Sequence, residues 1–223
     1  WTGRHPETVM KKLEGDLFPD LGQRPIAEIT ARELLAVIRK IEERGALDMA
    51  KKTLQHVGQI FRYAIIEGKA ERDPSADLKG ALKTAKTKHR AYLKEDELPE
   101  YLGKLGAYDG HILTKLALKM VLLTFVRSSE LRGALWTEFD FDKKEWRIPA
   151  ERMKMNELHI VPLADQTIAL LQEIKQHTGH RDNVFPNQQS PRSIMSENTL
   201  LLAWYRMGYH SRATTHGFRS TAS

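Results

Sequence analysis

The stretch "FDFDKKEWRIPAERMKMNELHIVPL", residues 139–163, departs from the helical periodicity that most of the chain follows. It contains short apolar, β-prone runs that are separated by the polar turns "DKK" and "MNE". Runs of this kind between turn residues predict strands joined by hairpins. We therefore expect a small antiparallel sheet of about three strands in this part of the chain.

The segments on either side of this sheet space their apolar residues as helices do. The predicted helices are "LKEDELPEYLGKL", "HILTKLALKMVLLTF", "SSELRGALW", "ADQTIALLQEIKQHTG" and "SENTLLLAWYRMGY". Ser128 or Ser129 is placed to cap the third of these helices, and Ser196 the fifth. The predicted fold class is therefore mostly α with a small antiparallel β-sheet inside the second part of the chain.

The N-terminal part is predicted to be helical throughout. In "ITARELLAVIRKIEERG", Thr30 is the expected N-cap, and Glu33 follows three residues later, which is the capping-box spacing. Apolar residues then recur at helical intervals until Gly45 ends the run.

A second amphipathic helix is predicted in "MAKKTLQHVGQIFRYAIIEG", residues 49–68, and we expect Pro74 to break it. The predicted apolar face consists of Leu54, Val57, Ile60, Phe61, Ala64 and Ile65. The polar side chains that lie largely off this stripe are Lys51, Lys52, Gln55, His56, Gln59 and Arg62. This polar face is either a solvated surface or a set of DNA contacts.

The net charge of +6 is concentrated in one short segment. Residues 1–82 and 91–223 are each close to neutral, whereas "KTAKTKHR", residues 83–90, contains Lys83, Lys86, Lys88 and Arg90 and no acid. A basic segment between two near-neutral parts can lie along a polyanion such as DNA or RNA. The alternative is a solvated linker with incidental charge. In both cases we expect a domain boundary near residues 83–91.

Composition indicates a globular protein of one or two domains, with 223 residues of which 41% are hydrophobic. The absence of cysteine excludes disulfides, thiolate zinc sites and cysteine nucleophiles. No apolar run reaches the roughly 18–20 residues of a membrane span, and the first residues lack the apolar stretch of a signal peptide. We therefore expect a cytoplasmic protein without a membrane anchor.

Four cationic side chains are distinguished by their context. Arg127 follows an apolar helix, Lys154 lies at the turn between two predicted strands, and His216 and Arg219 begin a helix capped by Thr214 or Thr215. Each has an ordinary structural explanation when taken singly: Arg127, for example, can pair with Glu130.

Taken together, the four cations suit phosphoryl transfer without a metal ion. The transition state of that reaction spreads negative charge over phosphate oxygens. A guanidinium group can grip two such oxygens at once, which an ammonium group cannot do. Lysine and histidine can move protons to and from bridging oxygens.

Three motifs, "LLTFVRSSELRGALW", "RIPAERMKMNELHIVPL" and "TTHGFRSTAS", together resemble the tyrosine recombinase (phage integrase) family, and most of all the integrases of prophages and genomic islands. The resemblance covers essentially the whole chain. It implies a helical core-binding domain at residues 1–82, a basic linker at 83–91 and a C-terminally truncated catalytic domain at 92–223.

The resemblance also implies roles for the four cations. Arg127 and Arg219 correspond to the two arginines that hold the non-bridging oxygens of the scissile phosphate. His216 corresponds to the histidine that assists proton transfer, and Lys154 to the hairpin lysine that protonates the departing 5′-oxygen. Glu130 is expected to be a structural partner in the arginine's surroundings.

The family's nucleophilic tyrosine follows the His-x-x-Arg motif, whereas this chain ends at Ser223. Tyr205 and Tyr209 precede the motif, and we expect both to be packing residues. The resemblance thus implies a fragment that binds double-stranded DNA as a monomer and forms no covalent link. The full-length enzyme would act as a tetramer on attachment sites, through a 3′-phosphotyrosine, without metal or cofactor.

Two other functions fit parts of the pattern. A non-catalytic helical DNA-binding regulator would share the basic linker and the polar helix face, but it has no use for the four cations together. A metal-dependent nuclease is suggested by His177 and His180 in "HTGH", but no trio of carboxylates lies near them in the sequence.

Overall fold

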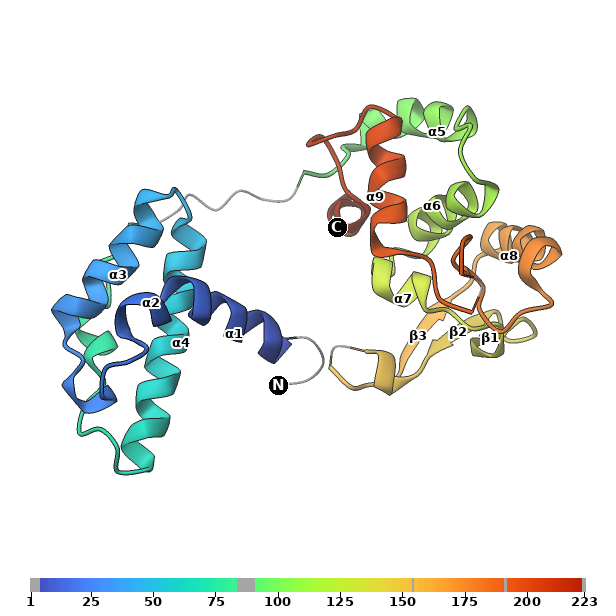
Figure 1. Ribbon diagram of the computed structural model, residues 1–223. Helices are drawn as coiled ribbons and strands as arrows, with labels where there is room; N and C mark the ends of the chain where they lie inside the picture. Colours follow the sequence, from blue (N-terminus) through green and yellow to red (C-terminus); the bar gives the residue numbers. More distant parts are fainter. Residues whose placement is uncertain (1–4, 84–90, 154, 191, 222–223) are drawn as a thin grey trace. The chain divides into compact units, whose positions relative to one another are not determined.

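The computed structural model describes residues 5–83, 91–153, 155–190 and 192–221 (Figure 1). The chain divides into two compact units, Trp1–Lys88 and His89–Ser223. Each unit has its own hydrophobic core, so the two are described separately. Among the described helices, none is long and apolar enough to cross a membrane.

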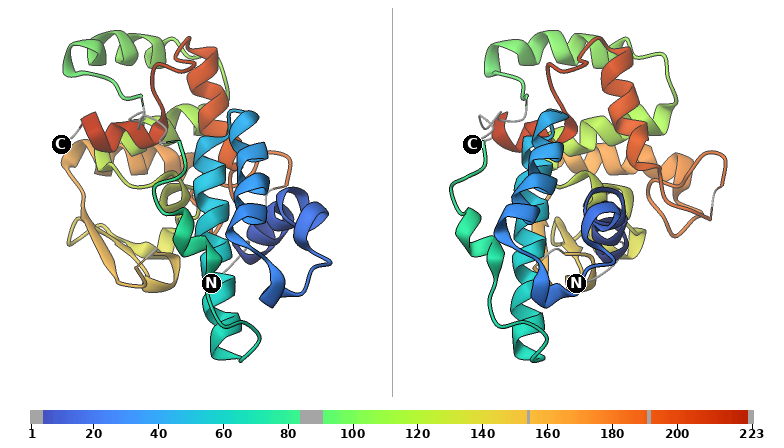
Figure 2. Two further views of the ribbon diagram at one scale, coloured as in Figure 1. Left: turned by 90° about the vertical axis from the view of Figure 1, so that its left-hand side faces the viewer. Right: turned by 60° about the vertical axis from the view of Figure 1, so that its left-hand side comes forward.

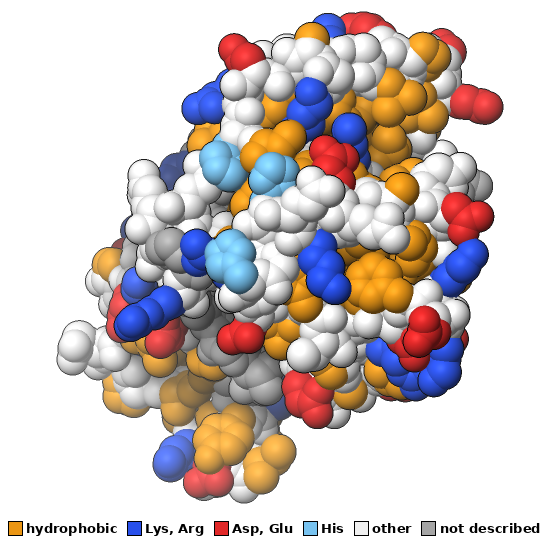
Figure 3. All heavy atoms as spheres, turned by 90° about the vertical axis from the view of Figure 1, so that its right-hand side faces the viewer, with side chains coloured by type: hydrophobic (Ala, Val, Ile, Leu, Met, Phe, Trp, Pro, Cys, Tyr) orange, Lys and Arg blue, Asp and Glu red, His pale blue; other side chains and the backbone are white. Residues whose placement is uncertain are grey.

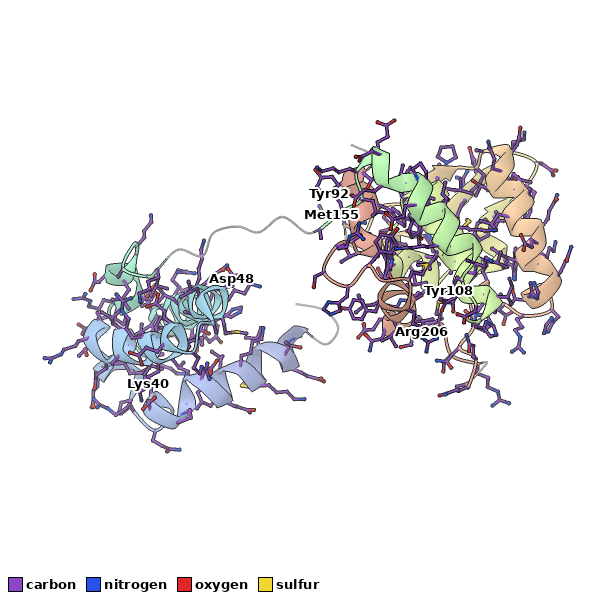
Figure 4. All side chains as sticks on the ribbon, turned by 90° about the horizontal axis from the view of Figure 1, so that it is seen from above. Lys40, Asp48, Tyr92, Tyr108, Met155 and Arg206 are labelled. Atoms are coloured by element: carbon purple, nitrogen blue, oxygen red, sulfur yellow. The ribbon has the colours of Figure 1, made fainter. Side chains whose placement is uncertain are left out.

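In the described part of the first unit, every element of regular secondary structure is a helix or a 3₁₀ turn. Its elements are α1 (His5–Asp16), α2 (Phe18–Leu21), the 3₁₀ turn η1 (Ile26–Glu28), α3 (Ala31–Glu43), α4 (Leu47–Ile66) and the 3₁₀ turn η2 (Pro74–Leu78). Helices α3 and α4 lie side by side, as Figures 1 and 2 show. Lys40 of α3, labelled in Figure 4, pairs with Asp20 of α2 across 2.7 Å.

Local signals set both ends of α3. The Thr30 hydroxyl accepts a hydrogen bond from the Glu33 N–H (3.3 Å), and the Glu33 carboxylate accepts one from the Thr30 N–H (3.0 Å), which confirms the predicted capping box. Gly45 has φ +78°, a left-handed conformation that glycine adopts without strain, and it follows the end of the helix.

The buried face of α4 differs from the predicted one. Ile60 and Ile65 are each 37% exposed, whereas Ala50, Thr53 and Val57 are buried. The turn η2 packs closely at Gly58, where a Cβ atom would lie 2.8 Å from the Ser75 hydroxyl oxygen. The elements that pack on α4 therefore cover a face displaced to one side of the predicted apolar stripe. Ile60 and Ile65 lie at the edge of that stripe, which remains exposed.

Helix α4 also ends before Pro74, the predicted breaking point. Gly68 has φ +70°, and the Lys69 N–H donates to the Ala64 carbonyl (2.8 Å) while the Gly68 N–H donates to the Ile65 carbonyl (3.0 Å). These two hydrogen bonds form the Schellman motif, a C-terminal capping motif of helices in which glycine takes the left-handed conformation. Pro74 instead opens η2, where the Asp73 side chain accepts a hydrogen bond from the Ser75 N–H (2.9 Å).

The second unit combines helices with a small sheet. Its elements are η3 (Glu95–Glu97), α5 (Leu98–Gly106), α6 (Ile112–Thr124), α7 (Ser128–Arg132), η4 (Trp136–Glu138), β1 (Phe139–Asp140), β2 (Glu145–Ile148), η5 (Ala150–Arg152), β3 (His159–Pro162), α8 (Asp165–Thr178), α9 (Glu197–Arg206), η6 (Thr215–Gly217) and α10 (Phe218–Thr221). The apolar helix α6 packs against α8 and α9. Ser196 caps α9 through a hydrogen bond from the Asn198 N–H (3.4 Å), as predicted.

The predicted three-stranded antiparallel sheet is confirmed, with the strand order β1-β2-β3. Trp146 lies opposite Phe139 on one side and Val161 on the other. Trp146 and Ile148 are fully buried and the intervening Arg147 is exposed, which is the alternation of a sheet that is covered on one face.

The expected serine cap of α7 is wrong. The N-cap is Arg127, and Ser128 and Ser129 lie inside the first turn. The Glu130 carboxylate accepts the Arg127 N–H (2.8 Å) and so takes the capping role from the third helical position.

Candidate phosphate-binding site

Arg127 lies in the tight connection between α6 and α7. Phe125 ends α6 in a left-handed conformation (φ 51°), and its N–H donates to the Val121 carbonyl (2.8 Å). The Arg127 guanidinium then pairs with Glu130 through Nη1 (2.5 Å). Glu130 is only 3% exposed, so this carboxylate fixes both the backbone and the side chain of Arg127. The interpretation of Glu130 as a structural partner is confirmed.

Arg219 reaches the same connection from the far end of the chain. It lies on α10 and is exposed, and its Nη1 donates to the Phe125 carbonyl (2.9 Å), which is 94 positions away in the sequence. Phe125 precedes Arg127 by two residues. The fold therefore brings the second arginine to the turn from which the first one projects.

An aromatic cluster holds α10 in this place. Phe218 is 1% exposed and packs edge-on against Tyr101, with ring centroids 5.3 Å apart. Tyr101 in turn stacks on Trp204 at 4.7 Å. The Trp204 indole N–H donates to the Thr215 hydroxyl (3.0 Å), which fixes η6 immediately before α10.

The backbone on either side of Phe218 is fixed as well. A Cβ atom on Gly217 would lie 2.6 Å from the Ala91 carbonyl oxygen, so the close approach of these two segments requires glycine. The Gly217 N–H donates to the Thr214 hydroxyl (3.1 Å), which agrees with the predicted cap. The Thr221 hydroxyl donates to the Leu93 carbonyl (2.7 Å). The short helix that carries Arg219 is therefore tied to the start of the second unit.

The other two predicted cations are placed less completely. The backbone of His216 lies in η6, directly before α10. Lys154 falls outside the described residues. The neighbouring residue Met155, which is labelled in Figure 4, is 74% exposed. The convergence of all four cations on one phosphate thus stays a prediction.

The predicted DNA-contacting residues of α4 lie on its outer surface. Lys51, Lys52, Gln55, Gln59 and Arg62 are exposed, and His56 is half-buried with its Nδ1 3.3 Å from the Gln59 side-chain oxygen. Arg62 also approaches the Asp73 carboxylate at 3.4 Å. A pair at this distance on an exposed surface is weak, so the Arg62 side chain can turn to another anion.

The linker begins from a fixed point on α3. The Lys83 N–H donates to the Glu42 carboxylate (2.7 Å), and Arg39 donates to the Ala81 carbonyl (2.9 Å). Burial acts to raise the pKa of Glu42, but the hydrogen bonds from Lys83 and Arg39 hold that pKa below its ordinary value. The side chain of Lys83 is exposed, and Lys86, Lys88 and Arg90 fall outside the described residues.

The two tyrosines near the arginine motif have packing roles. Tyr209 is fully buried against Tyr101 and Trp204, and burial raises the pKa of its hydroxyl. Tyr205 is 38% exposed and packs against the His210 ring at 4.4 Å. A phenol whose pKa is raised by burial is a poor nucleophile, because its reactive anion is disfavoured.

A charged cluster behind Arg127 was not indicated by the sequence. Arg152 of η5 donates to the Glu138 carboxylate and to the Glu130 carbonyl, and the Trp146 indole donates to the other oxygen of Glu138 (2.9 Å). No local pattern marks these residues, since their partners lie on separate elements of the fold.

Four hollows in the described part of the surface have linings that include neither Arg127 nor Arg219. One of about 400 Å³ is bounded by α6, α9 and the loop between α8 and α9, and its lining includes Tyr108 and Arg206, both labelled in Figure 4. The face drawn in Figure 3 mixes basic, acidic and apolar side chains without a continuous basic area. An exposed Arg219 and a half-buried Arg127, both outside these hollows, suit a duplex backbone, which a small enclosed pocket would not admit.

The described residues give no added support to the hypothesis of a metal-dependent nuclease. Within them, no three His, Asp or Glu side chains gather closely enough to hold a metal ion. His180 is 3.2 Å from the Arg181 guanidinium, which donates to its ring nitrogen.

Comparison with known proteins matches both units to one family. Residues 1–81 match the family model described as "Phage integrase central domain", and residues 91–223, more than half of the chain, match "Phage integrase family". The chain is 42% identical over 236 residues to the integrase of Enterobacteria phage P4, covering all of this chain and 54% of that protein. It is 33% identical to the prophage integrase IntS of Escherichia coli K12, covering 98% of this chain and 57% of that protein. The chain thus spans about half the length of the curated relatives it matches.

Solved structures with the same fold include a lambda integrase dimer bound to a COC′ core site, at a TM-score of 0.78 and 22% identity, covering 100% of this chain and 64% of that one. The Tn1549 transposon integrase in complex with circular intermediate DNA is similar at a TM-score of 0.72 and 17% identity, covering 96% of this chain and 77% of that one. At these identities the likeness shows the fold alone.

Proposed function

The chain belongs to the phage integrase family, and from this premise we propose that it carries the DNA-binding and phosphate-holding parts of a tyrosine-type site-specific recombinase. The observation that supports the proposal most strongly is the hydrogen bond from Arg219 to the Phe125 carbonyl, at the turn that carries Arg127. Two guanidinium groups at one turn can bind the non-bridging oxygens of a single phosphate.

In the proposed reaction, Arg127 and Arg219 stabilise the charge that develops on the scissile phosphate. His216 assists proton transfer, and Lys154 protonates the departing 5′-oxygen. A tyrosine beyond residue 223 attacks the phosphorus and displaces the 5′-hydroxyl, which leaves a 3′-phosphotyrosine bond. Religation reverses this exchange, so the phosphodiester energy is retained and neither ATP nor a metal ion is required.

DNA is held in the proposal by both units and by the segment between them. The exposed side of α4 supplies contacts to the duplex through Lys51, Lys52, Gln55, His56, Gln59 and Arg62. The linker cations lie along the phosphates and let the two units grip the duplex as a clamp. The first unit would thus act as the core-binding domain and the second as the catalytic domain.

The linker's contribution can be measured through the salt dependence of DNA binding. Replacing Lys83, Lys86, Lys88 and Arg90 with alanine should weaken binding to any duplex sequence. It should also flatten the plot of log affinity against log salt by a slope of roughly 0.9 for each lost phosphate contact. Fluorescence anisotropy with a labelled duplex over a series of salt concentrations gives this slope.

A matched control removes four cations that are already paired with acids. The control variant replaces Lys40, Arg44, Lys143 and Lys144, whose partners are Asp20, Asp16, Asp140 and Asp165. It changes the net charge by the same amount and should affect the slope far less. An unchanged slope in the linker variant would show that the linker stays off the phosphates.

Assembly on DNA is proposed by analogy with a lambda integrase tetramer bound to a Holliday junction, which has the same fold at a TM-score of 0.78 and 21% identity. A longer protein that contains this chain should form a tetramer on attachment-site DNA, whereas residues 1–223 should sediment as a monomer. Sedimentation velocity with and without duplex distinguishes the two states, and a stable dimer of residues 1–223 would contradict the proposal.

The decisive test of the function incubates a longer protein that contains this chain with an attachment-site duplex that carries a nick close to the cleavage position. Cleavage by a recombinase releases a short strand with a 5′-hydroxyl, and the loss of this strand traps the protein on the DNA. A regulator that only binds DNA leaves the duplex intact. A denaturing gel of the labelled DNA therefore separates the two candidate functions.

A further inference from the structure

We propose that Arg152 is a positioning residue that holds Arg127 where the scissile phosphate binds, by fixing the short helix α7 from behind. This inference rests on the proposed recombinase function. Arg152 lies on η5, and its side chain is 22% exposed. Of the contacts given above, only its hydrogen bond to the Glu130 carbonyl connects it to α7, the helix that Arg127 caps.

The contacts form a continuous chain from the sheet to Arg127. Trp146 of β2 is fully buried and donates to Glu138, whose side chain is 6% exposed. Arg152 donates to the same carboxylate with Nη1 and to the Glu130 carbonyl with Nη2. The carboxylate of Glu130 then holds the N–H and the guanidinium of Arg127.

Helix α7 needs such a support because it is only five residues long. The last four carbonyl groups of an α-helix lack partners within the helix, and in so short a helix this includes the Glu130 carbonyl. Arg152 supplies the missing donor. The position of Arg127 at the N-cap is thereby coupled to the rigid sheet instead of depending on one helical turn.

The site accepts an arginine and no other cation in the same role. A guanidinium reaches the Glu138 carboxylate and the Glu130 carbonyl with separate nitrogens in a fixed plane, whereas the single ammonium of lysine cannot span both. Space for the planar group exists because residue 133 is glycine: a Cβ atom there would lie 3.0 Å from Nη2 and 3.3 Å from Cζ of Arg152.

The experiment uses a longer protein that contains this chain and its C-terminal segment, a nicked attachment-site duplex, and single-turnover cleavage at saturating protein. Arg152→Gln should lower the cleavage rate ~100-fold, because a displacement of about 1 Å in a positioning group has an effect of this size. DNA affinity should change less than about twofold, since Arg152 makes no phosphate contact in the proposal. Arg147→Gln is the matched control, because Arg147 is an exposed arginine of the preceding strand β2 that pairs with Glu145.

A second variant separates positioning from simple stabilisation. Arg152→Lys keeps a cation beside Glu138, so the melting temperature should stay close to that of the parent, but it cannot also hold the Glu130 carbonyl. We expect this variant to cleave at least about tenfold more slowly than the parent, from the loss of one fixed hydrogen bond to the positioning network. A lysine variant that cleaves at the parental rate would overturn the proposal, since the ion pair alone would then suffice.

A modified substrate tests the link to Arg127. Replacing one non-bridging oxygen of the scissile phosphate with a methyl group removes a negative charge and lessens the need for precisely placed guanidinium groups. The defect of Arg152→Gln should shrink to a few-fold on this methylphosphonate. An equal defect on both substrates would overturn the proposal, because a general loss of structure slows both alike.

The controls also separate this inference from the function on which it rests. A parent protein that cleaves neither substrate would overturn the recombinase function and the inference together. A parent that cleaves normally while Arg152→Gln does so at the same rate would overturn the inference alone.

Discussion

A protein that extends this chain to the length of its integrase relatives should become covalently joined to a nicked attachment-site duplex, whereas residues 1–223 should bind the duplex and form no covalent adduct. Arg127 and Arg219 can stabilise charge on the phosphate, but guanidinium groups are not nucleophiles. Of the two tyrosines that most closely precede the His-x-x-Arg motif in the sequence, Tyr209 is buried with a raised pKa and Tyr205 packs on His210.

This expectation is measured on a denaturing gel with a label on the strand that keeps its 3′-phosphate. The longer protein should shift the labelled strand to a protease-sensitive band, and residues 1–223 should leave it in place. Tyr205→Phe and Tyr209→Phe in the shorter protein serve as controls. A shifted band from residues 1–223 that disappears in either variant would show that the nucleophile lies within the chain.

The second large effect is expected at Arg219. In the longer protein, Arg219→Ala should lower the rate of strand cleavage by about 100- to 1,000-fold, the usual consequence of removing one preorganised group that stabilises transition-state charge. DNA affinity and melting temperature should change little, because the side chain is exposed and α10 is held by Phe218 and Thr221. Arg219→Lys should recover only part of the rate, since an ammonium group cannot grip two oxygens.

Arg206→Ala is the matched control for this measurement. Arg206, labelled in Figure 4, is an exposed arginine on α9 that lines the hollow of about 400 Å³, and the lining of this hollow does not include Phe125. Single-turnover cleavage should be unaffected by its loss. Equal losses in the two variants would indicate a general effect of positive charge, and normal cleavage by Arg219→Ala would remove the phosphate-binding role from this residue. Arg127→Ala is a less clean variant, because it also leaves the buried Glu130 carboxylate without its guanidinium partner.

Elements whose causes lie within one or two turns of chain can be predicted from the amino-acid sequence. The capping box at Thr30, the cap at Ser196 and the three strands of residues 139–163 were predicted correctly, since side chain, backbone and turn chemistry act there between near neighbours. The motifs around Arg127 and Arg219 also indicate the family from the sequence alone.

The features that depend on contacts between residues distant in the sequence are fixed only by the tertiary structure. Ile60 and Ile65 of α4 are exposed because η2 packs to one side of the predicted stripe, which periodicity alone does not specify. The partnership of Arg152 with Glu138 and Glu130 joins three separate elements. Arg219 meets the Phe125 carbonyl across 94 positions only because an aromatic cluster seats α10 there. Local spacing carries no information on such contacts, because they arise when buried apolar surfaces dock and bring distant polar groups together.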